Sequence, residues 1–581
     1  MNRNTFYATT FVDELARAGL HHVCAAPGSR HTPLMLAFAK DERFKVWPHL
    51  DERSASFFAL GLARALDEPV ALICTSGTAG ANMYPAIIEA HQSRIPLLVI
   101  TADRPPELRH SGANQTIDQI KMFGDFVLWF VDAALPESNP PTVAIRNLRT
   151  LADRALAKAK GLRKGVVHIN MPFRKPLEPT EVEGDIFDAS SGAENDKSVP
   201  RTQMYSSYIF KEYGEEIGHE LYKIEEGLII CGPTLTEKEV VAVQSLASAL
   251  EYPIVVDALS GARFENHRLD RLVGSSELML DAINYTSKVI LRFGSMPLSK
   301  KLNDYVVKLN PSRYIAVSSD DTWSDDAHLI TDFIPSNIEP FCYELMPFVL
   351  SSSHDLWWLE GWQSVEYIAW ETIDHEMANG AYFDGGVVYD VVDLIPDGST
   401  LFAGNSLPVR HLDQFGKPQD KRIYTYANRG ASGIDGNIST ALGAGAARPD
   451  APLVSILGDI TFYHDMNGLL AVHRCGVPVT IVLLNNDGGG IFQRLPINQF
   501  DPEFTEWFVT PHGLDYSHAA KMYGLEWVSV QGREEFRQAF SASVTGRTST
   551  IIEFRSDAKT DLARRNEIVA AVHARLKELD L

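Results

Sequence analysis

Two short polar motifs, separated by a helix-like segment, carry groups suited to binding a divalent metal ion. Gly458-Asp459 follows the apolar run 452–457, and Asn485-Asn486 follows the apolar run 478–484. Both motifs stand where a buried strand is expected to end, which is where an open α/β sheet binds its ligands. Turn residues that merely end two strands are the alternative interpretation.

The candidate metal ligands are a carboxylate, an amide oxygen and a backbone carbonyl, from Asp459, Asn486 and Gly488. Mg²⁺ prefers such hard oxygen ligands, and it takes few of them from protein and the rest from phosphate and water. Helical apolar spacing over 461–474 predicts a strand, a helix and a strand, an order that brings the two motifs side by side. The segment therefore predicts a metal–diphosphate site at a sheet edge.

Length and composition narrow the class of protein. A chain of 581 residues predicts roughly three or four domains. Hydrophobic residues make up 45% of it, and no apolar run approaches the roughly 20 residues of a membrane span. Residues 1–20 mix charges into a helical pattern, so we expect neither a signal peptide nor an anchor, and a cytoplasmic protein. A net charge of -22 argues against nucleic acid and anionic membranes as partners.

The cysteines offer neither a metal site nor a disulfide framework. All five are single, without CxxC spacing, and most lie in apolar runs: Cys24, Cys74, Cys231, Cys342 and Cys475. We expect buried, reduced thiols.

Short apolar runs alternate with helix-like segments in three successive blocks. This pattern predicts an α/β protein of three domains, each with a mainly parallel sheet flanked by helices. The expected strands are 21–26, 45–50, 70–75, 96–101 and 166–170 in the first block, 227–231, 253–257, 288–293 and 314–318 in the second, and 400–403, 453–457, 479–484 and 549–554 in the third.

Polar, apolar-poor stretches mark the boundaries between the blocks. We expect a first domain over 1–181, a linker over 182–203, a central domain over 204–352 and a last domain over 353–581, with the boundary near 351–355 and a terminal helix over 561–581. A dinucleotide-binding protein is the alternative for such a fold, but no strand is followed by GxGxxG and a suitably spaced acid.

The first block carries a second pair of motifs at strand ends. Glu52 follows the expected strand 45–50 and precedes an alanine-rich helix, and the next strand ends in Ser76-Gly77-Thr78-Ala79-Gly80-Ala81-Asn82. Taken singly, the glutamate reads as a helix N-terminal acid and the glycine-rich string as a turn.

Together with Gly-Asp and Asn-Asn in the last block, however, these motifs resemble the thiamine-diphosphate-dependent enzymes. The resemblance implies a pyrimidine-binding domain, a central domain and a diphosphate-binding domain, in the order of the three blocks. It implies thiamine diphosphate held through Mg²⁺ or Mn²⁺, with Glu52 bonded to the aminopyrimidine ring. Because that family places each cofactor between two subunits, we expect a homodimer at minimum, with a tetramer as the larger option.

Four arginines, Arg30, Arg104, Arg410 and Arg429, stand in expected loops beside strand ends of this acidic chain. Any one alone reads as an ordinary ion-pair residue. Together they indicate small-molecule substrates that bear several carboxylates, for which the planar guanidinium is a suitable donor.

Six strings, four in the first block and two in the last, resemble the 2-succinyl-5-enolpyruvyl-6-hydroxy-3-cyclohexene-1-carboxylate synthase family of menaquinone biosynthesis, and the resemblance covers all three blocks. The strings are PGSR, SGTA, TADRPPEL, GANQTI, GNSLPVR and NRGASGIDG. The resemblance extends to about Phe554. It implies a transferase that decarboxylates 2-oxoglutarate and adds the succinyl carbanion to isochorismate. Both substrates are dianions, which gives the four arginines a reason.

Carried over residue by residue, the resemblance implies overlapping sets. The metal ligands are Asp459, Asn486 and Gly488. The cofactor residues are Glu52, Ser76, Gly77, Asn82, Ser432, Gly433, Ile434, Asp459, Ile460, Thr461, Asn486, Gly488, Gly489, Ile491 and Phe492. The substrate residues are Ser29, Arg30, Arg104, Asn114, Gln115, Lys300, Ser406, Arg410, Arg429, Ile491, Phe492 and Leu495. The catalytic residues are Glu52, Arg30, Gln115, Ser406 and Arg410.

Two positions depart from the family pattern. Ile460 follows Asp459 where the commonest triplet has glycine, and Lys301 stands where an arginine is expected beside Lys300. Ile434 would be the apolar wedge that bends the cofactor, although Ile434, Ile491 and Leu495 read as ordinary core without the family.

Two other classes stay open at this point. An acetolactate synthase-like enzyme or a 2-oxo acid decarboxylase would share the cofactor, but the four arginines favour anionic partners over a small apolar donor. Many such decarboxylases also carry a histidine pair after the fourth strand, where this chain has only His110. A catalytically silent scaffold on the same fold predicts the loss of Glu52, Asp459 or Asn486, and all three are present.

Overall fold

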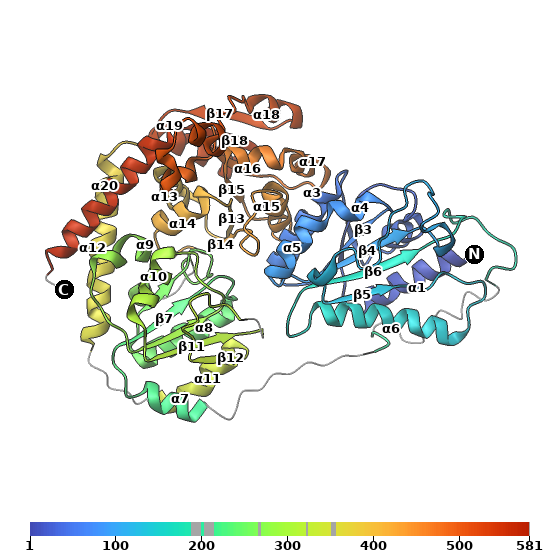
Figure 1. Ribbon diagram of the computed structural model, residues 1–581, viewed down its shortest axis with the longest axis horizontal. Coiled ribbons are helices and arrows are strands. Elements are labelled where there is room, and N and C mark those ends of the chain that lie inside the picture. The colour runs from blue at the N-terminus through green and yellow to red at the C-terminus, as the bar shows by residue number, and fades with distance from the viewer. Residues whose placement is uncertain (187–198, 203–213, 265–268, 321–322, 350–355, 580–581) are drawn as a thin grey trace. The chain divides into compact units, whose positions relative to one another are not determined.

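The computed structural model (Figure 1) describes residues 1–186, 199–202, 214–264, 269–320, 323–349 and 356–579. The chain divides into two compact units. The first comprises Met1–Ser206, Asn428–Asp450 and His464–Pro478, and the second comprises Ser207–Ala427, Ala451–Tyr463 and Val479–Leu581. Most of the expected linker, and the expected boundary at 351–355, lie outside the described residues.

The first unit contains a six-stranded parallel sheet in the order β2-β1-β3-β4-β6-β5. Its central strands β3, β4 and β6 are buried along their whole length, as expected for a sheet covered on both faces. The strands are β1 (His22–Ala25), β2 (Lys45–Pro48), β3 (Val70–Cys74), β4 (Leu97–Asp103), β5 (Trp129–Asp132) and β6 (Val166–Pro172), and the helices are α1 (Arg3–Arg17), α2 (Thr32–Lys40), α3 (Glu52–Leu66), α4 (Thr78–Asn82), α5 (Tyr84–Gln92) and α6 (Thr142–Ala159).

A second six-stranded parallel sheet, in the order β12-β11-β10-β7-β8-β9, lies in the second unit. Its strands are β7 (Gly227–Cys231), β8 (Ile254–Val256), β9 (Leu272–Val273), β10 (Val289–Phe293), β11 (Arg313–Ser318) and β12 (Asp332–Pro335), and its helices are α7 (Gly214–Leu221), α8 (Glu237–Leu250), α9 (Ser276–Met279), α10 (Lys300–Leu309) and α11 (Ile338–Val349).

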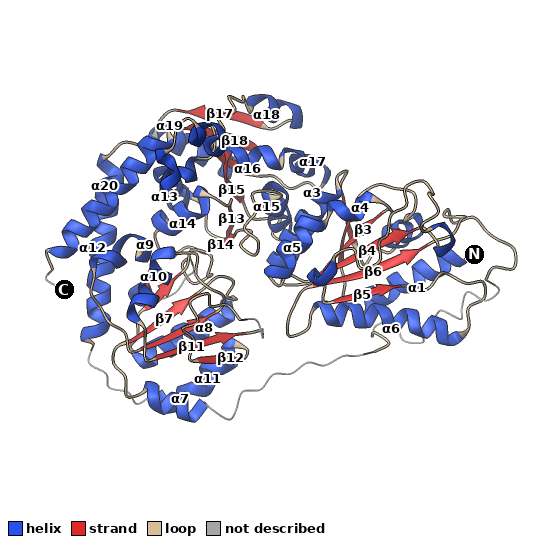
Figure 2. Ribbon diagram, viewed as in Figure 1, coloured by secondary structure: helices blue, strands red, loops and turns tan. Residues whose placement is uncertain are grey.

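The third sheet, also parallel and in the same unit, has the order β14-β13-β15-β16-β18-β17. Figure 2 shows its strands in red between helices. The strands are β13 (Ser399–Ala403), β14 (Ile423–Tyr426), β15 (Leu453–Gly458), β16 (Thr480–Asn485), β17 (Glu526–Val530) and β18 (Thr550–Arg555), and the helices of this part of the chain are α12 (Trp357–Asn379), α13 (Asp384–Leu394), α14 (Leu407–Phe415), α15 (Asn437–Ala446), α16 (Asp459–His464), α17 (Leu470–Arg474), α18 (Ser517–Tyr523), α19 (Arg533–Gly546) and α20 (Ala558–Lys577).

The predicted α/β architecture with three parallel sheets is confirmed, and each of the thirteen expected strands corresponds to a strand of the structure. The prediction missed five strands, β5, β9, β12, β14 and β17. These five are edge strands, and β2 is the one edge strand that was predicted. Edge strands bury fewer residues: β5 has no buried residue and β17 has one, so neither reads as an apolar run.

Two local predictions about helices need correction. The segment 461–474 is not one helix but three pieces, α16, a 3₁₀ turn over Met466–Leu469 and α17. The break falls at Asp465, whose extended φ of -136° interrupts the helix and whose carboxylate bonds to another element. Arg410 was expected in a loop, but it lies in α14, which begins at Leu407 because Pro408 suits the first turn of a helix.

Within the first unit, α15 packs closely against α3 (Figure 1). Glycine makes this approach possible from both sides. A Cβ atom at Gly61 would overlap the carbonyl of Thr440, and one at Gly443 would overlap the carbonyl of Phe58. The backbones therefore touch, and the loop before α15 is held next to the first sheet's helices.

Candidate functional site

Four neighbouring strands of the first sheet lead directly into candidate residues. The strands β2, β1, β3 and β4 lie next to one another, and all are parallel. After their carboxyl ends come Glu52, Arg30, Ser76 and Arg104, respectively. Parallel strands end at one edge of a sheet, so these side chains start from the edge at which α/β proteins bind ligands.

Glu52 is the first residue of α3. Asp51 caps this helix by accepting a hydrogen bond from the backbone N–H of Arg53 at 2.9 Å. Glu52 is half-buried, and burial together with the charge of Asp51 raises the pKa of its carboxyl above the ordinary value. A carboxyl with a raised pKa can hold or release a proton nearer to neutral pH, which suits proton exchange with a basic ring nitrogen.

The glycine-rich turn after β3 is tied to the segment around Gln115. Ser76 Oγ donates to the Gln115 carbonyl at 3.1 Å, and Gln115 Nε2 donates to the Ser76 carbonyl at 3.0 Å. Gly77 has a φ of +90°, and its N–H donates to Gln119 Oε1 at 2.9 Å. Two candidate residues, Ser76 and Gln115, are thus brought together and held by Gln119.

Gln119 belongs to a buried polar network that motif analysis did not identify. Its Nε2 donates to Asn170 Oδ1 at 2.9 Å, and Asn170 Nδ2 donates to Asp103 Oδ2 at 2.9 Å. Asp103 also accepts from the N–H of Arg104 at 2.7 Å. Fully bonded networks of this kind rigidify a site, so they fix the ends of β4 and β6 beneath the candidate residues.

The remaining candidates of this edge differ in exposure. Arg30 is buried, and its Nη1 donates to the Phe173 carbonyl at 2.8 Å. Arg104 is half-buried, and its Nε has no hydrogen-bond partner among the described residues. Ser29, Asn82 and Asn114 are exposed.

The loop that carries Arg429, Ser432, Gly433 and Ile434 belongs to the first unit by its contacts. Glu89 of α5, only 3% exposed, holds this loop through its carboxylate. One oxygen accepts from the N–H of Gly430 at 2.8 Å, and the other accepts from the N–H of Ala431 at 2.6 Å. Such charge-assisted bonds to backbone are stronger than neutral ones. Glu89 is a positioning residue that the sequence motifs did not reveal.

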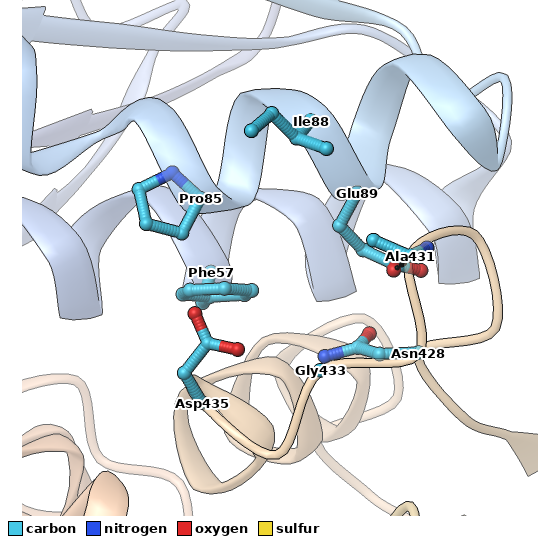
Figure 3. A pocket seen from close by; sticks show the side chains of 8 residues that line it. All are labelled: Phe57, Pro85, Ile88, Glu89, Asn428, Ala431, Gly433 and Asp435. Carbon is cyan, nitrogen blue, oxygen red and sulfur yellow. Dashed lines mark hydrogen bonds between the residues drawn. The ribbon is translucent and has the colours of Figure 1, made fainter.

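A cavity of about 180 Å³ lies beneath this loop (Figure 3). Ligand pockets usually exceed about 300 Å³, so the cavity is too small for a cofactor. The eight residues around it are Phe57, Pro85, Ile88, Glu89, Asn428, Ala431, Gly433 and Asp435.

The starts of α3 and α15 are linked through the segment that follows α16. Asp465 is fully buried and accepts from the N–H of Ser439, in the first turn of α15, at 2.7 Å. Burial raises the pKa of Asp465 to about 7. Arg53 donates to the His464 carbonyl at 2.8 Å, and Asn467 Nδ2 donates to Asp51 Oδ2 at 2.7 Å. The neighbourhood of Glu52 and the Ile434 loop are therefore anchored to one short segment.

In the second unit, the adjacent strands β15 and β16 end at the two motifs proposed for the metal. Asp459 is buried, and its Oδ2 accepts from the N–H of Gly488 at 2.9 Å. Its Oδ1 accepts from the N–H of Ile460 at 2.7 Å. Burial raises the pKa of Asp459. The expected neighbourhood of Asp459 and Gly488 is present, and Ile460 and Thr461 lie in the first turn of α16.

Asn486 provides a test of whether these residues fit a metal ion. Its Oδ1 is buried and has no hydrogen-bond partner among the described residues, so an oxygen lone pair is directed at nothing in the protein. A buried amide oxygen without a partner is unfavourable unless another group binds it. The described residues contain no group of three or more His, Cys, Asp or Glu side chains that could hold a metal ion. The expected ligand set has only one such side chain, Asp459, so it would not form a group of this kind. The donor set fits a hard cation.

His512, which no motif indicated, stands beside these ligands. Its Nε2 lies 3.3 Å from Asp459 Oδ2, and its Nδ1 lies 3.3 Å from Asp487 Oδ1. Tyr516 Oη donates to the Asp459 carbonyl at 3.1 Å. These contacts orient Asp459, a role typical of residues around a ligating carboxylate.

Left-handed backbone conformations recur at the candidate residues. Gln115, Ser406 and Ser432 have φ values of 55°, 74° and 61°, and Asp487, between two candidate ligands, has 57°. Such conformations cost about 1–3 kcal/mol each outside glycine and gather at functional sites. Gly488, at 143°, has no room for a side chain because a Cβ atom would overlap the Val509 carbonyl.

The other candidates of the second unit lie on different elements. Arg410 Nη1 donates to the Ser406 carbonyl at 2.7 Å, so these two are brought together at the N-terminus of α14. Ile491 and Phe492 are half-buried in the 3₁₀ turn η7 (Gly490–Arg494), which Gly489 precedes, and Leu495 after it is exposed. Lys300 begins α10 and is mostly exposed; it pairs with Asp304 at 2.8 Å, which leaves it outside the clusters above.

The five cysteines are free thiols, as expected; four are buried, and Cys475 is half-buried. No helix among the described residues is both long and apolar enough to cross a membrane.

Comparison with known families matches three segments of the chain. Residues 7–122 match "Thiamine pyrophosphate enzyme, N-terminal TPP binding domain", residues 210–403 match "Middle domain of thiamine pyrophosphate", and residues 410–554 match "Thiamine pyrophosphate enzyme, C-terminal TPP binding domain".

Curated relatives match over the full length. A protein of Roseiflexus castenholzii is 55% identical over 580 residues, 99% of each chain. One of Haloarcula marismortui is 43% identical over 98% of each chain, and one of Bacillus cytotoxicus is 38% identical over 99% of this chain and 98% of its own. All three are named 2-succinyl-5-enolpyruvyl-6-hydroxy-3-cyclohexene-1-carboxylate synthase.

Proposed function

We propose that this chain catalyses the reaction for which its family is named. The chain belongs to the 2-succinyl-5-enolpyruvyl-6-hydroxy-3-cyclohexene-1-carboxylate synthase family of thiamine pyrophosphate enzymes. It decarboxylates 2-oxoglutarate and joins the remaining succinyl group to isochorismate, in menaquinone biosynthesis. The observation that carries the proposal is the 55% identity over 99% of both chains.

Thiamine diphosphate, when bound, supplies the electron sink that makes loss of CO₂ and carbon–carbon bond formation possible. The chain's own residues hold and orient it. Glu52 would hold a proton at the aminopyrimidine. Ser76 and Gly77, which Gln115 and Gln119 hold in place, would bind the same part of the cofactor. Ile434 would provide apolar packing for the bound cofactor.

We assign the divalent cation, Mg²⁺ or Mn²⁺, to Asp459, Asn486 and the Gly488 carbonyl. The partnerless Asn486 Oδ1 supports this assignment, as does the closeness of Asp459 to Gly488. Carboxylate, amide and carbonyl oxygens suit either ion, and the cation neutralises the diphosphate.

The substrates' carboxylates are assigned to cationic and polar side chains. Arg30, Arg104, Asn114 and Gln115 serve isochorismate, with Lys300 from the central domain. Ser406, Arg410 and Arg429 serve the succinyl side. Burial lowers the pKa of Arg410, which marks a guanidinium held partly out of water, where a carboxylate partner is bound more strongly.

The assembly follows from the family resemblance. We propose a cytoplasmic homodimer at minimum, because the family's cofactor binds between the pyrimidine-binding domain of one subunit and the diphosphate-binding domain of another. The proposed domains are 1–181, 204–352 and 353–581, joined by the linker 182–203. Analytical ultracentrifugation of the protein with and without cofactor tests the assembly, and a monomer that turns over substrate would contradict it.

One assay separates this function from the acetolactate synthase-like alternative. The protein is supplied with 2-oxoglutarate, isochorismate, thiamine diphosphate and Mg²⁺, and the loss of isochorismate is followed. We expect consumption that requires all four components. If isochorismate is untouched and pyruvate alone yields acetolactate, the proposed function is wrong.

A further inference from the structure

Three arginines from separate elements of the second unit lie close enough for their charges to interact. Arg410 lies on α14, Arg494 ends η7, and Arg565 lies on α20. Arg565 Nε donates to Gln414 Oε1, on the same helix as Arg410, at 3.4 Å. Moreover, η7 packs on α20, and both α14 and α20 pack on α9. Three guanidinium groups are thereby concentrated in one place.

The negative charge around these arginines is limited and already engaged. Glu277 of α9 accepts from Ser299 Oγ at 2.6 Å and from the N–H of Lys301 at 3.2 Å, and it lies 4.0 Å from Arg565 Nη2. Asp384 is bonded to His411 Nε2 at 2.9 Å. Among the residues that the structure describes, the guanidinium of Arg494 has neither a hydrogen-bond partner nor an ion-pair partner, and Asp384 and Glu277 act on it only from a distance.

The electrostatic consequence is an excess of positive charge in a partly desolvated place. Burial, and then the neighbouring charges of Arg565 and Arg410, lower the pKa of Arg494 to about 10. Burial lowers the pKa of Arg410 and Arg565 as well. All three remain charged at neutral pH, so the cluster costs folding stability unless an anion joins it.

The position of Arg494 shows where that anion would come from. In a 3₁₀ turn, side chains three residues apart lie on the same face, so Arg494 shares a face with Ile491. Ile491 is one of the residues assigned to the wall of the substrate pocket. Arg410, whose charge acts on Arg494, is assigned to the succinyl carboxylate. Arg494 is therefore close to one residue of the proposed pocket and shares a face with another.

We infer that Arg494 is a specificity-determining residue, which binds the distal carboxylate of a 2-oxo dicarboxylic acid together with Arg410. Arg565, held by Gln414 and Glu277, is a positioning residue that keeps the two guanidinium groups aimed at the same anion. The planar fork of arginine suits a carboxylate bound through two oxygens. This inference rests on the proposed function and names the residue that selects the donor substrate.

The test compares two donor substrates that differ only at the distal end. 2-Oxopentanoate has a methyl group where 2-oxoglutarate has its second carboxylate. In the Arg494→Met holoenzyme, we expect the ratio of kcat/KM for 2-oxoglutarate to that for 2-oxopentanoate to fall by about 10- to 100-fold, mainly through KM, because a charge-assisted hydrogen bond is lost. Arg494→Lys keeps the charge without the fork and should restore part of the ratio.

A second measurement does not depend on turnover. Glutarate, a dianion that cannot be decarboxylated in this way, should raise the melting temperature of the wild type more than butyrate does, and this difference should shrink in Arg494→Met. Without ligand, the variant should melt at the same temperature as the wild type or higher, because a repulsive cation has been removed. The matched control is Arg575→Met on α20, whose side chain is half exposed and pairs with Glu371 and Glu578.

Three outcomes would contradict either the role of Arg494 or the proposed function. If the substrate ratio and the glutarate effect in Arg494→Met equal those of Arg575→Met, Arg494 does not bind the donor and the inference is wrong. If Arg494→Met melts well below the wild type and both donors lose activity equally, Arg494 is a structural residue, which also overturns it. If the wild-type enzyme does not turn over 2-oxoglutarate, the proposed function is wrong.

Discussion

Replacing Glu89 with glutamine should release the loop that carries Arg429 and Ser432. The Glu89 carboxylate is 3% exposed and accepts from the backbone N–H groups of Gly430 and Ala431 at 2.8 and 2.6 Å. It also accepts from Ser93 Oγ at 2.8 Å. A glutamine has only one oxygen, so its NH₂ group must face a donor where the second carboxylate oxygen stood.

The size of the effect follows from these contacts. Hydrogen bonds to a charged group contribute about 1.5–3 kcal/mol each. The variant loses one outright and weakens the others, so we expect the loop to open more easily by about 3 kcal/mol. That free energy corresponds to roughly 100-fold faster amide hydrogen exchange at Gly430 and Ala431, if exchange proceeds through local opening.

Hydrogen exchange measured by mass spectrometry on a peptide covering 428–436 provides the assay. Exchange should accelerate there in Glu89→Gln, while peptides of β15 and β16 keep the wild-type rate. Glu42→Gln, at an exposed position of the same unit, is the matched control. The KM for 2-oxoglutarate should also rise. Wild-type exchange over 428–436 in Glu89→Gln would refute the claim that this carboxylate holds the loop.

Three further perturbations address the cofactor, the metal and the buried acid. Glu52→Gln should lower turnover by at least about 100-fold. The dissociation constant of thiamine diphosphate, measured by calorimetry, should change little, because the metal and diphosphate contacts remain. Equal losses of turnover and of cofactor affinity would contradict the role of Glu52 in activating the cofactor. Asn486→Leu removes the buried Oδ1 that has no partner among the described residues. Without metal, the melting temperature of this variant should equal or exceed that of the wild type, and Mg²⁺ with thiamine diphosphate should no longer raise it. A variant that Mg²⁺ and thiamine diphosphate still stabilise would show that Asn486 is not a metal ligand. Burial raises the pKa of Asp465 to about 7 in the folded protein, so its stabilising contribution is complete below about pH 4 and is lost as the pH rises through 7. Asp465→Asn should therefore gain stability relative to the wild type by up to about 4 kcal/mol between pH 4 and 8, in urea unfolding curves; a pH-independent difference would show that Asp465 does not titrate in this range.

The sequence predicts the interior of each sheet better than its edges. Interior strands such as β3 and β16 are buried along their whole length and therefore read as apolar runs. β14 alternates buried and half-buried residues over four positions, and β9 has only two residues. Hydrophobic patterns this short also occur in loops. Edge strands therefore form through tertiary pairing, which the local sequence does not predict.

In the candidate site, the sequence predicts the residues at strand ends better than the residues that support them. Asp459, Asn486 and Glu52 stand out because each follows an apolar run directly. Glu89 and Gln119 lie away from strand ends, and their partners are distant; 341 residues separate Glu89 from Gly430. Their roles come from tertiary packing. Arg494 was also overlooked, because only the folded structure shows that its guanidinium has no ion-pair partner among the described residues.

Under the proposed function, the chain transfers four carbons of 2-oxoglutarate to isochorismate and releases the fifth as CO₂. Uniformly ¹³C-labelled 2-oxoglutarate, unlabelled isochorismate, thiamine diphosphate and Mg²⁺ test it in one experiment, followed by mass spectrometry. We expect one labelled CO₂ and one product with four labelled carbons for every isochorismate consumed. Labelled CO₂ released without loss of isochorismate, or a product that keeps all five labelled carbons, would contradict the account.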